Sequence, residues 1–485
     1  MRDRSSLRVL AAPALALFAL AGCSSLIPPY ERPALPVAPG YAAEMMPAVA
    51  SGSEVAADVD WQRFFADARL KQLIALALVN NRDLRVAVLN IEQTRALYQV
   101  RRADEWPTVG AGATVARQPI GSSVATSYAV GLAVTSYELD LFGRVHDLSQ
   151  AALAQYFATA ENRKAVQISL VASVATAYLN LLADDELLRV TRQTLQTREE
   201  STRLTKLRFD NGASSELDFR QAESLLEGAR VALAQSLRQH ALDENALVLL
   251  VGQPLPADLA PPLPLDRQQV PVELPAGLPS DLLIRRPDVR SSEQQLLAAN
   301  ANIGAARAAF FPRISLTANL GSASSELSGL FKSGSFAFTG TAQLLQPIFD
   351  AGRNRANLDV AKVGRDIAVA QYERAIQSAF REVADALAGR ATLGEQLRAQ
   401  AAQTDALAIT YRLADLRYRA GAASYLDSLD AQRSLFNAQL ALVQTQALHL
   451  QNLVTLYRVL GGGWRESAEV SAVSNPTIPP PAGAR

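Results

Sequence analysis

Two carboxylates spaced three residues apart, Asp427 and Asp430, end the segment LRYRAGAASYLDSLDAQ at residues 416–432. Paired carboxylates can transfer protons or bind cations. A blurred copy, LRFDNGASSELDFRQAE at residues 207–223, has Asp218 where the first segment has Asp427, but a glutamine where it has Asp430. The shared aspartate and the unshared one are therefore expected to have different roles.

The shared aspartates follow a serine at a fixed spacing, just after a glycine turn. Ser215 with Asp218, and Ser424 with Asp427, have the spacing of a capping box at the start of a new helix. An aspartate in a first helical turn is also favoured by the helix dipole. Capping and a pore role both stay open for these two aspartates. Asp430 lies one turn further along the helix, where capping does not explain it.

Enzyme chemistry finds no support in the remaining residues. His146, His240 and His449 are isolated, the single cysteine is Cys23, and the glycines at 461–463 indicate a helix stop rather than a nucleotide loop. Neither a metal site nor a nucleophile constellation can be assembled from these spacings. We expect a protein that is not an enzyme and has no cofactor and no metal.

Composition favours long helices over other classes. The formal net charge is zero, charged residues make up 19% and aromatic residues 6% of the chain, and no basic patch is present. Nucleic acid is therefore not an expected partner.

The N-terminus has the order of a secretory signal peptide. Arginines among the first eight residues precede the apolar stretch VLAAPALALFALAG, and Cys23 follows. The sequence LAGC resembles a bacterial lipobox, in which Cys23 would carry a covalent lipid after removal of residues 1–22. Ser24 resembles the sorting residue of outer-membrane lipoproteins. An acylated Cys23 leaves no cysteine for a disulfide.

The chain is a tandem duplication of a unit near 200 residues. Gly212 and Gly421 are 421 − 212 = 209 residues apart, and Gly143 falls on Gly352 at the same shift. Pro107 and Pro312 are 205 apart, so one insertion of four residues reconciles the two shifts.

Proline placement predicts very long helices in each unit. No proline occurs between Pro119 and Pro254 or between Pro347 and Pro476. A single helix from Gly143 to Phe209 would be roughly 100 Å long. The last helix has a heptad seam typical of a coiled coil, formed by Phe436, Leu440, Val443, Ala447, Leu450, Val454 and Tyr457.

Between these helices the apolar period changes to two, which predicts one β-hairpin per unit, at about 107–142 and about 312–350. In the first, Tyr128, Val130, Leu132 and Val134 share a face opposite small residues. After residue 22, no stretch of eighteen mostly apolar residues remains, so no transmembrane helix is predicted. If the strands span lipid, four cannot close a barrel, whereas three copies of the chain supply twelve.

Taken together, these features resemble those of one known protein family. The segment LPSDLLIRRPDVRSSEQQLLAANANIGAARAAFFPRISL, residues 278–316, resembles the signature of TolC/OprM-type outer-membrane efflux proteins, specifically the acylated OprM-like branch. The lipobox, the duplication, the hairpins and YRAG…YLDSLDAQRSL agree with it over nearly the whole mature chain. The resemblance implies an α+β membrane channel-tunnel, a homotrimer with a 12-stranded outer-membrane β-barrel continuous with a long periplasmic α-helical coiled-coil barrel.

The expected organisation follows from the duplication and the resemblance. It comprises a signal peptide at 1–22, an acylated N-terminal segment of an equatorial belt at 23–65, repeat 1 at 66–253 with long helices at 143–252, a proline-rich belt linker at 254–280, repeat 2 at 281–463 with long helices at 352–461, and a C-terminal tail at 464–485.

The resemblance implies the exit duct of a tripartite efflux pump, lipid-anchored and spanning the bacterial outer membrane, extending into the periplasm and passively conducting small molecules. Its implied partners are a periplasmic adaptor protein, an inner-membrane pump of the resistance-nodulation-division type and outer-membrane lipid. The alternatives are an outlet for type I protein secretion or metal-ion efflux, and a lipid-anchored coiled-coil scaffold without a pore.

By resemblance, the copied segments lie at the closed periplasmic tip. Leu426 and Asp430 match the constriction, and Tyr418 matches an aromatic residue that holds the tip shut. In a trimer, three Asp430 side chains would converge, raise one another's pKa and attract cations; a solvated outer face is the alternative. The resemblance offers Gly212, Ala213, Gly421 and Ala422 as contacts for the adaptor. Ala423 departs from relatives that carry a basic residue there, so an arginine latch is not expected.

Overall fold

The computed structural model describes residues 25–41, 59–121, 123–268 and 285–464. Cys23, the predicted signal peptide, the tail from residue 465, and parts of the N-terminal segment and of the proline-rich linker lie outside these residues. The chain forms two compact units. The sheet unit comprises Met1–Ala34, Leu89–Glu161 and Arg290–Ala375, and the tip unit comprises Leu35–Val88, Asn162–Val289 and Ile376–Arg485.

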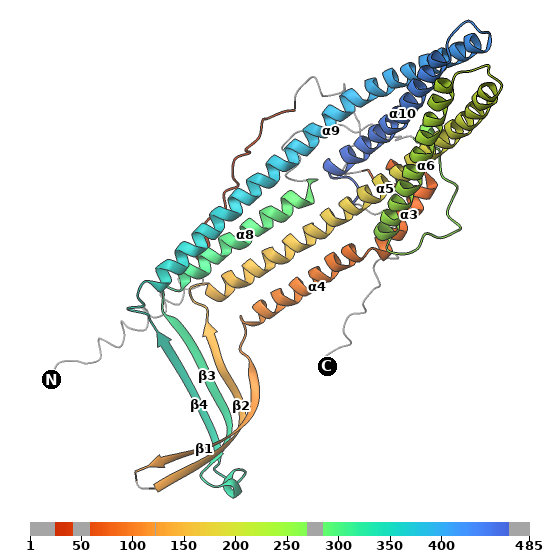
Figure 1. The fold of residues 1–485 in the computed structure, drawn as a ribbon. Helices are drawn as coiled ribbons and strands as arrows, with labels where there is room; N and C mark the ends of the chain where they lie inside the picture. Colours follow the sequence, from red (N-terminus) through yellow and green to blue (C-terminus); the bar gives the residue numbers. More distant parts are fainter. Residues whose placement is uncertain (1–24, 42–58, 122, 269–284, 465–485) are drawn as a thin grey trace, which may run out of the picture. The chain divides into compact units, whose positions relative to one another are not determined.

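The sheet unit contains one four-stranded antiparallel sheet in the order β1-β2-β3-β4 (Figure 1). Its strands are β1 Val109–Ile120, β2 Ser123–Leu139, β3 Arg313–Ser324 and β4 Phe336–Leu345, with the short η5 Leu327–Gly329 between the last two. Each predicted hairpin is confirmed. The two hairpins also pair with each other through β2 and β3, so the repeats share a single sheet.

The register places large apolar side chains on one face of this sheet. Leu132 on β2 lies opposite Leu320 on β3, which lies opposite Phe338 on β4. The neighbouring row, one residue along each strand, is Ala133, Asn319 and Thr339. Because successive side chains on a strand point to opposite faces, one face is apolar and the other is small or polar.

Four helices join the sheet at one end, where β1 and β3 begin and β2 and β4 end. α4 Arg82–Ala103 precedes β1, α5 Arg144–Asp210 follows β2, α8 Pro287–Ala308 precedes β3, and α9 Arg353–Arg419 follows β4. α5 and α9 are 67 residues each, which confirms the prediction of one uninterrupted helix after Gly143. Each of the four helices contributes residues to both units.

The N-terminal residues of the sheet unit attach to α5 and α8. Ser25 Oγ donates to Asp147 Oδ1 at 2.6 Å, and Tyr30 Oη and Arg32 Nε donate to Glu293 Oε1 at 2.9 Å and 2.8 Å. Burial raises the pKa of Asp147, which the hydrogen bond from Ser25 partly offsets.

The tip unit adds α2 Trp61–Phe64, α3 Ala68–Asn80, α6 Glu216–Val251, the short η3 Leu265–Arg267 and α10 Tyr425–Val459. Its core includes Phe64, which stacks on Tyr457 at 3.9 Å between ring centroids. Six of the seven predicted seam residues of α10 are buried and Leu440 is half-buried, so the heptad pattern correctly located the packed face.

Among the described residues, α5 is the helix that is long and apolar enough to cross a membrane by length and composition. Within the most apolar 18-residue stretch of α5, 61% is buried inside the protein. Ile168, Val171, Val174 and Ala175 are among the buried side chains. This stretch therefore has the burial of a core helix.

Candidate functional site

The predicted tip consists of two similar helix-turn-helix connections in the tip unit. α5 ends at Asp210 and α6 begins at Glu216, while α9 ends at Arg419 and α10 begins at Tyr425. Gly212 and Gly421 have φ of 70° and 74°, the left-handed conformation that glycine adopts without strain.

Hydrogen bonds close both turns in the same way. The N–H of Ala213 donates to the carbonyl of Arg208 at 2.7 Å, and the N–H of Ala422 donates to the carbonyl of Arg417 at 2.9 Å. These are the six-to-one bonds of a Schellman motif, with the glycine at its left-handed position. The predicted adaptor contacts are thus the turn residues themselves, and their role in binding an adaptor stays a prediction.

Both shared aspartates cap helices. Ser215 Oγ accepts from the N–H of Asp218 at 3.1 Å, and Asp218 Oδ2 accepts from the N–H of Ser215 at 3.3 Å. Ser424 and Asp427 repeat this arrangement at 3.2 Å in both directions. The capping alternative is therefore observed for Asp218 and Asp427, and a pore role for either stays a prediction.

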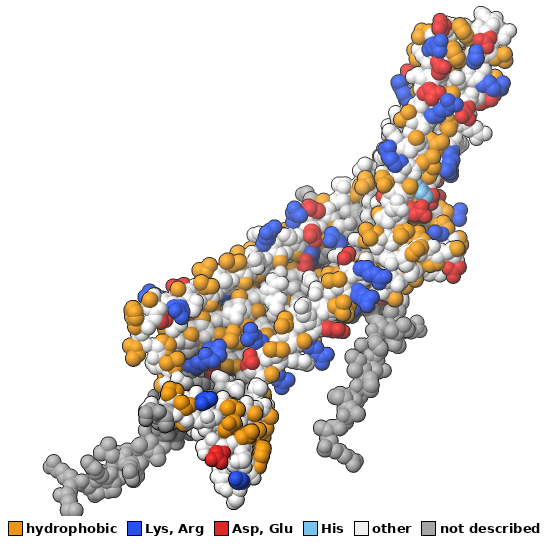
Figure 2. All heavy atoms as spheres, turned by 60° about the horizontal axis from the view of Figure 1, so that its bottom comes forward, with side chains coloured by type: hydrophobic (Ala, Val, Ile, Leu, Met, Phe, Trp, Pro, Cys, Tyr) orange, Lys and Arg blue, Asp and Glu red, His pale blue; other side chains and the backbone are white. Residues whose placement is uncertain are grey.

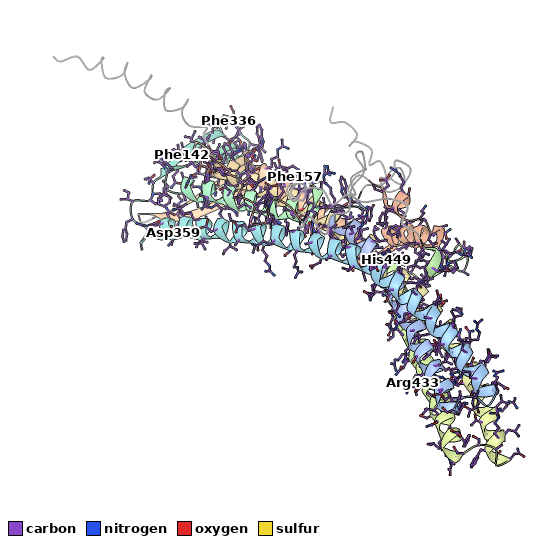
Figure 3. The ribbon with its side chains drawn as sticks, turned by 90° about the horizontal axis from the view of Figure 1, so that it is seen from above. Phe142, Phe157, Phe336, Asp359, Arg433 and His449 are labelled. Carbon is purple, nitrogen blue, oxygen red and sulfur yellow. The ribbon has the colours of Figure 1, made fainter. Side chains whose placement is uncertain are left out.

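Asp430 does no capping. Its Oδ1 accepts from Arg433 Nη2 at 2.8 Å, and the two side chains are 57% and 60% exposed. Leu426, one turn earlier on α10, is also exposed. Figure 3 labels Arg433 on this helix. The two predicted constriction residues therefore share an accessible stretch of α10, where the arginine three residues after Asp430 accompanies them.

Tyr418 joins the two hairpins within one chain. Arg208 Nη1, near the end of α5, donates to Tyr418 Oη at 2.6 Å, and the Arg208 guanidinium lies 5.3 Å from the centre of the Tyr418 ring. The Tyr418 ring lies 5.0 Å from that of Tyr425 at the start of α10. The expected aromatic residue of the tip thus has a cationic partner on the other hairpin, which we name the Arg208–Tyr418 clasp.

A small core lies beneath this clasp. Ala222, Tyr425 and Leu429 are buried together, with Leu225 and Tyr418 packed against them. Ser201 Oγ and Tyr425 Oη lie 2.9 Å apart, which links α5 to α10. This core is therefore one place where the two hairpins pack against each other.

Arg198 on α5 supports this core from below. It is buried, donates from Nη1 to the carbonyl of Leu225 at 2.8 Å, and lies with its guanidinium 5.1 Å from the centre of the Phe436 ring. Burial lowers the pKa of Arg198. The guanidinium thus ties α5 to both α6 and α10.

A cleft of about 520 Å³ opens between α5, α9 and α10 beside the clasp. Tyr411, Asp415 and Gln432 are among its lining residues. Burial raises the pKa of Tyr411. Asp415 Oδ2 is held by Arg419 Nε at 2.8 Å. Across the described ranges, no group of three or more His, Cys, Asp or Glu side chains is placed to hold a metal ion.

The sequence did not indicate Arg208, Arg433 or Ser201 as members of the site. Arg433 had a usable signal, because an arginine three residues after an aspartate on a helix is a standard ion-pair spacing. Arg208 had no such signal in the sequence. Arg417 occupies the same position in the second repeat, so the sequence does not distinguish the two arginines.

The family model described as outer membrane efflux protein matches residues 73–253 and 278–462. The chain is 48% identical over 467 residues to the toluene efflux pump outer membrane protein TtgC of Pseudomonas putida, covering 93% of this chain and 95% of that protein. It is 46% identical over 454 residues to the outer membrane protein OprJ of Pseudomonas aeruginosa, covering 92% and 94%.

Solved structures are similar over the same length. The open state of the MtrE outer membrane channel of Neisseria gonorrhoeae has a TM-score of 0.84 at 43% identity, covering 91% of this chain and 99% of that one. CusC has a TM-score of 0.81 at 39% identity, covering 91% and 100%.

These similarities confirm the predictions of an outer-membrane location, of a channel-tunnel fold with four strands per chain, and of service as the outer-membrane component of an efflux pump. From the family model, the relatives and the solved channels together, this chain belongs to the outer membrane efflux protein family.

Proposed function

We propose that three copies of this chain assemble into a passive, gated exit duct for toxic organic compounds, in which three four-stranded sheets close one barrel of twelve strands. The observation that carries the proposal is the open sheet. Within the described residues, β1 pairs only with β2 and β4 only with β3, so each outer strand keeps one unpaired edge.

Open edges are incompatible with lipid, because an unpaired backbone N–H or C=O finds no water there. Four strands are too few to close a barrel, since small barrels need about eight. Pairing β1 of one copy with β4 of the next satisfies every edge, and a head-to-tail contact of this kind forms a ring.

The two faces of the sheet support the same assembly. Phe336 and Phe338 on β4, Val115 on β1 and Leu320 on β3 are exposed in the single chain. Figure 2 shows hydrophobic side chains gathered on the lobe that the sheet forms. The opposite face carries small and polar residues, as expected for the lining of an aqueous bore.

The duct performs no chemical step of its own. In this proposal, a periplasmic adaptor and an inner-membrane pump of the resistance-nodulation-division type load it, and a lipid on Cys23 adds a second membrane attachment. The name of the relative TtgC, a toluene efflux pump outer membrane protein, supports toxic organic compounds as the cargo.

The gate is proposed at the tip. Three Asp430 side chains, one from each copy, converge with Leu426 and narrow the bore, while the Arg208–Tyr418 clasp holds the hairpins of each chain together. The exposure of Asp430 and Leu426 in the single chain supports this role, because a pore-facing residue must be accessible from the bore.

A matched pair of substitutions tests the assembly. Phe338→Arg places a charge on the lipid-facing side of β4, which costs about 2–4 kcal/mol near the middle of a bilayer. Thr339→Arg, one residue further, places the same charge in the bore. We expect Phe338→Arg to abolish the heat-modifiable trimer in outer-membrane fractions, and Thr339→Arg to retain the trimer and to alter its conductance.

Equal tolerance of the two charges, or loss of the trimer in Thr339→Arg alone, would contradict the proposed barrel. The cargo is tested separately with a deletion strain grown on organic solvents, antibiotics, dyes and metal salts. The expected result is sensitivity to solvents and antibiotics, with resistance restored by the wild-type gene. Sensitivity confined to metal salts would favour a metal-ion efflux outlet instead. Loss of a secreted protein without any sensitivity would favour an outlet for type I protein secretion.

A further inference from the structure

A pair of carboxyls, one buried and one half-buried, connects α5 and α6 at a distance from the tip. Asp184 on α5 is 6% exposed, and no N–H or O–H of the described residues donates to its Oδ2. The carboxyl of Asp243 on α6 lies within hydrogen-bonding reach of it. The pair therefore spans the packed face of the first hairpin.

Two carboxyls in contact need a proton. When both are ionised, each is only a hydrogen-bond acceptor, so the contact becomes a repulsion between two like charges, one of them buried. When one is protonated, its O–H donates to the other. Burial, followed by the contact with Asp243, raises the pKa of Asp184 to about 7. Asp184 therefore donates this hydrogen bond at acid pH.

The surroundings do not supply a substitute donor. The ionisable groups that act most strongly on Asp184 are Asp243 and His240 on α6 and Asp185 on α5, and none of them lies on α3 or α10, which also pack against α6. His240 Nε2 lies 3.1 Å from Asp185 Oδ1. Gln239 Nε2 donates to Asp243 Oδ2 at 3.1 Å, whereas no donor among the described residues reaches Asp184 Oδ2.

The second repeat lacks this pair. At the shift of 209 residues, Asp184 corresponds to Leu393 (184 + 209) and Asp243 to Asn452 (243 + 209). Asn452 Nδ2 donates to the carbonyl of Ala386 on α9 at 3.0 Å, a bond that needs no shared proton. The α9–α10 hairpin is therefore an internal control for α5–α6.

We propose that Asp184 and Asp243 form a one-proton site that ties α5 to α6 in acid and loosens the α5–α6 hairpin as the pH rises above neutrality. The ligand is the proton alone. The site is independent of the proposed trimer, because both carboxyls belong to one chain.

The sign of the effect follows from linkage. A carboxyl whose pKa is raised by packing binds its proton more tightly in the packed state, so its stabilisation is full below its ordinary pKa near 4 and is lost as the pH rises through about 7. For one proton, the packed state loses about tenfold in its equilibrium against local opening between pH 6 and pH 8.

Hydrogen exchange of the full-length protein in detergent micelles tests the site at pH 6 and pH 8, with exchange times scaled for the intrinsic rate at each pH. Peptides around Asp184 and Asp243 are expected to lose about tenfold in protection at the higher pH. Peptides around Leu393 and Asn452 are expected to keep theirs.

Two substitutions decide whether the carboxyl pair causes the response. In Asp184→Asn, the amide donates to Asp243 at every pH, so the loss of protection disappears. Asp185→Asn, the exposed neighbour, keeps the wild-type response. Asp243→Asn repeats the test from α6 if the first variant does not fold. A response that persists in the variants at 184 or 243, including one driven by His240, would overturn the proposal, as would an equal response in α9 and α10.

Discussion

Breaking the Arg208–Tyr418 clasp should open the tip. Tyr418→Phe removes only the hydroxyl that accepts from Arg208 at 2.6 Å, whereas Arg208→Ala also removes the cation beside the ring. Arg208 is exposed and Tyr418 half-buried. The net hydrogen bond is then worth about 1 kcal/mol, and the cation–π contact about 0.5–1 kcal/mol.

The magnitude sets the expected gating effect. A loss of about 1–2 kcal/mol per chain shifts an equilibrium between closed and open hairpins by roughly 5- to 30-fold. We expect the fraction of time spent conducting in planar bilayers to rise by about that factor in Arg208→Ala. The rise should be smaller in Tyr418→Phe, because that substitution removes only the hydrogen bond.

A double-mutant cycle isolates the contact. If the clasp acts as described, Arg208→Ala adds little once Tyr418 is already phenylalanine, apart from the cation–π part, so the two effects are not additive. Arg417→Ala is the matched control, because Arg417 holds the equivalent position in the second repeat and its Nη2 contacts the carbonyl of Ala422 in its own turn. Strictly additive effects, or an opening in Arg417→Ala as large as in Arg208→Ala, would refute the reasoning.

Three further outcomes are expected. Ser424→Ala removes the capping oxygen of α10 and should lower thermal stability by about 1 kcal/mol, with full activity in a strain that is grown below its melting temperature. Asp430→Asn breaks an exposed pair with Arg433 and should change stability by less than about 1 kcal/mol, yet reduce the preference of the channel for cations in bilayer recordings. Burial lowers the pKa of His449, so the folded state resists protonation of this side chain. The contribution of His449 to folding stability is therefore present above its ordinary pKa near 6.5 and is lost as the pH falls below that value. His449→Gln should flatten the acid side of a profile of stability against pH, followed by circular dichroism.

Sequence periodicity was sufficient for the elements but not for how they pair. A proline-free tract and a change of period from 3.6 to two are local properties, so they located α5, α9 and both hairpins. The pairing of β2 with β3 joins Leu139 to Ile314 across most of a repeat. No local pattern encodes a contact at that separation, because it depends on how the intervening helices fold back.

The duplication had opposite effects on different parts of the site. It separated the capping residue Asp427, which has a counterpart, from Asp430, which has none, and the structure shows Asp427 in a capping box. It also hid the clasp, because Arg208 and Arg417 are equivalent in sequence and only the packed hairpins decide which reaches across. The burial of Asp184 could not be predicted, because Asp184 and Asp185 are adjacent and the sequence alone does not tell which of them is buried.

The central claim is a conducting duct closed at a tip that Asp430 narrows, and single-channel recording of the purified protein in planar bilayers tests it most directly. Discrete conductance steps are predicted for the wild-type chain, with larger steps or longer openings in Asp430→Ala. A protein that migrates as a trimer but gives no conductance in either form would contradict the account.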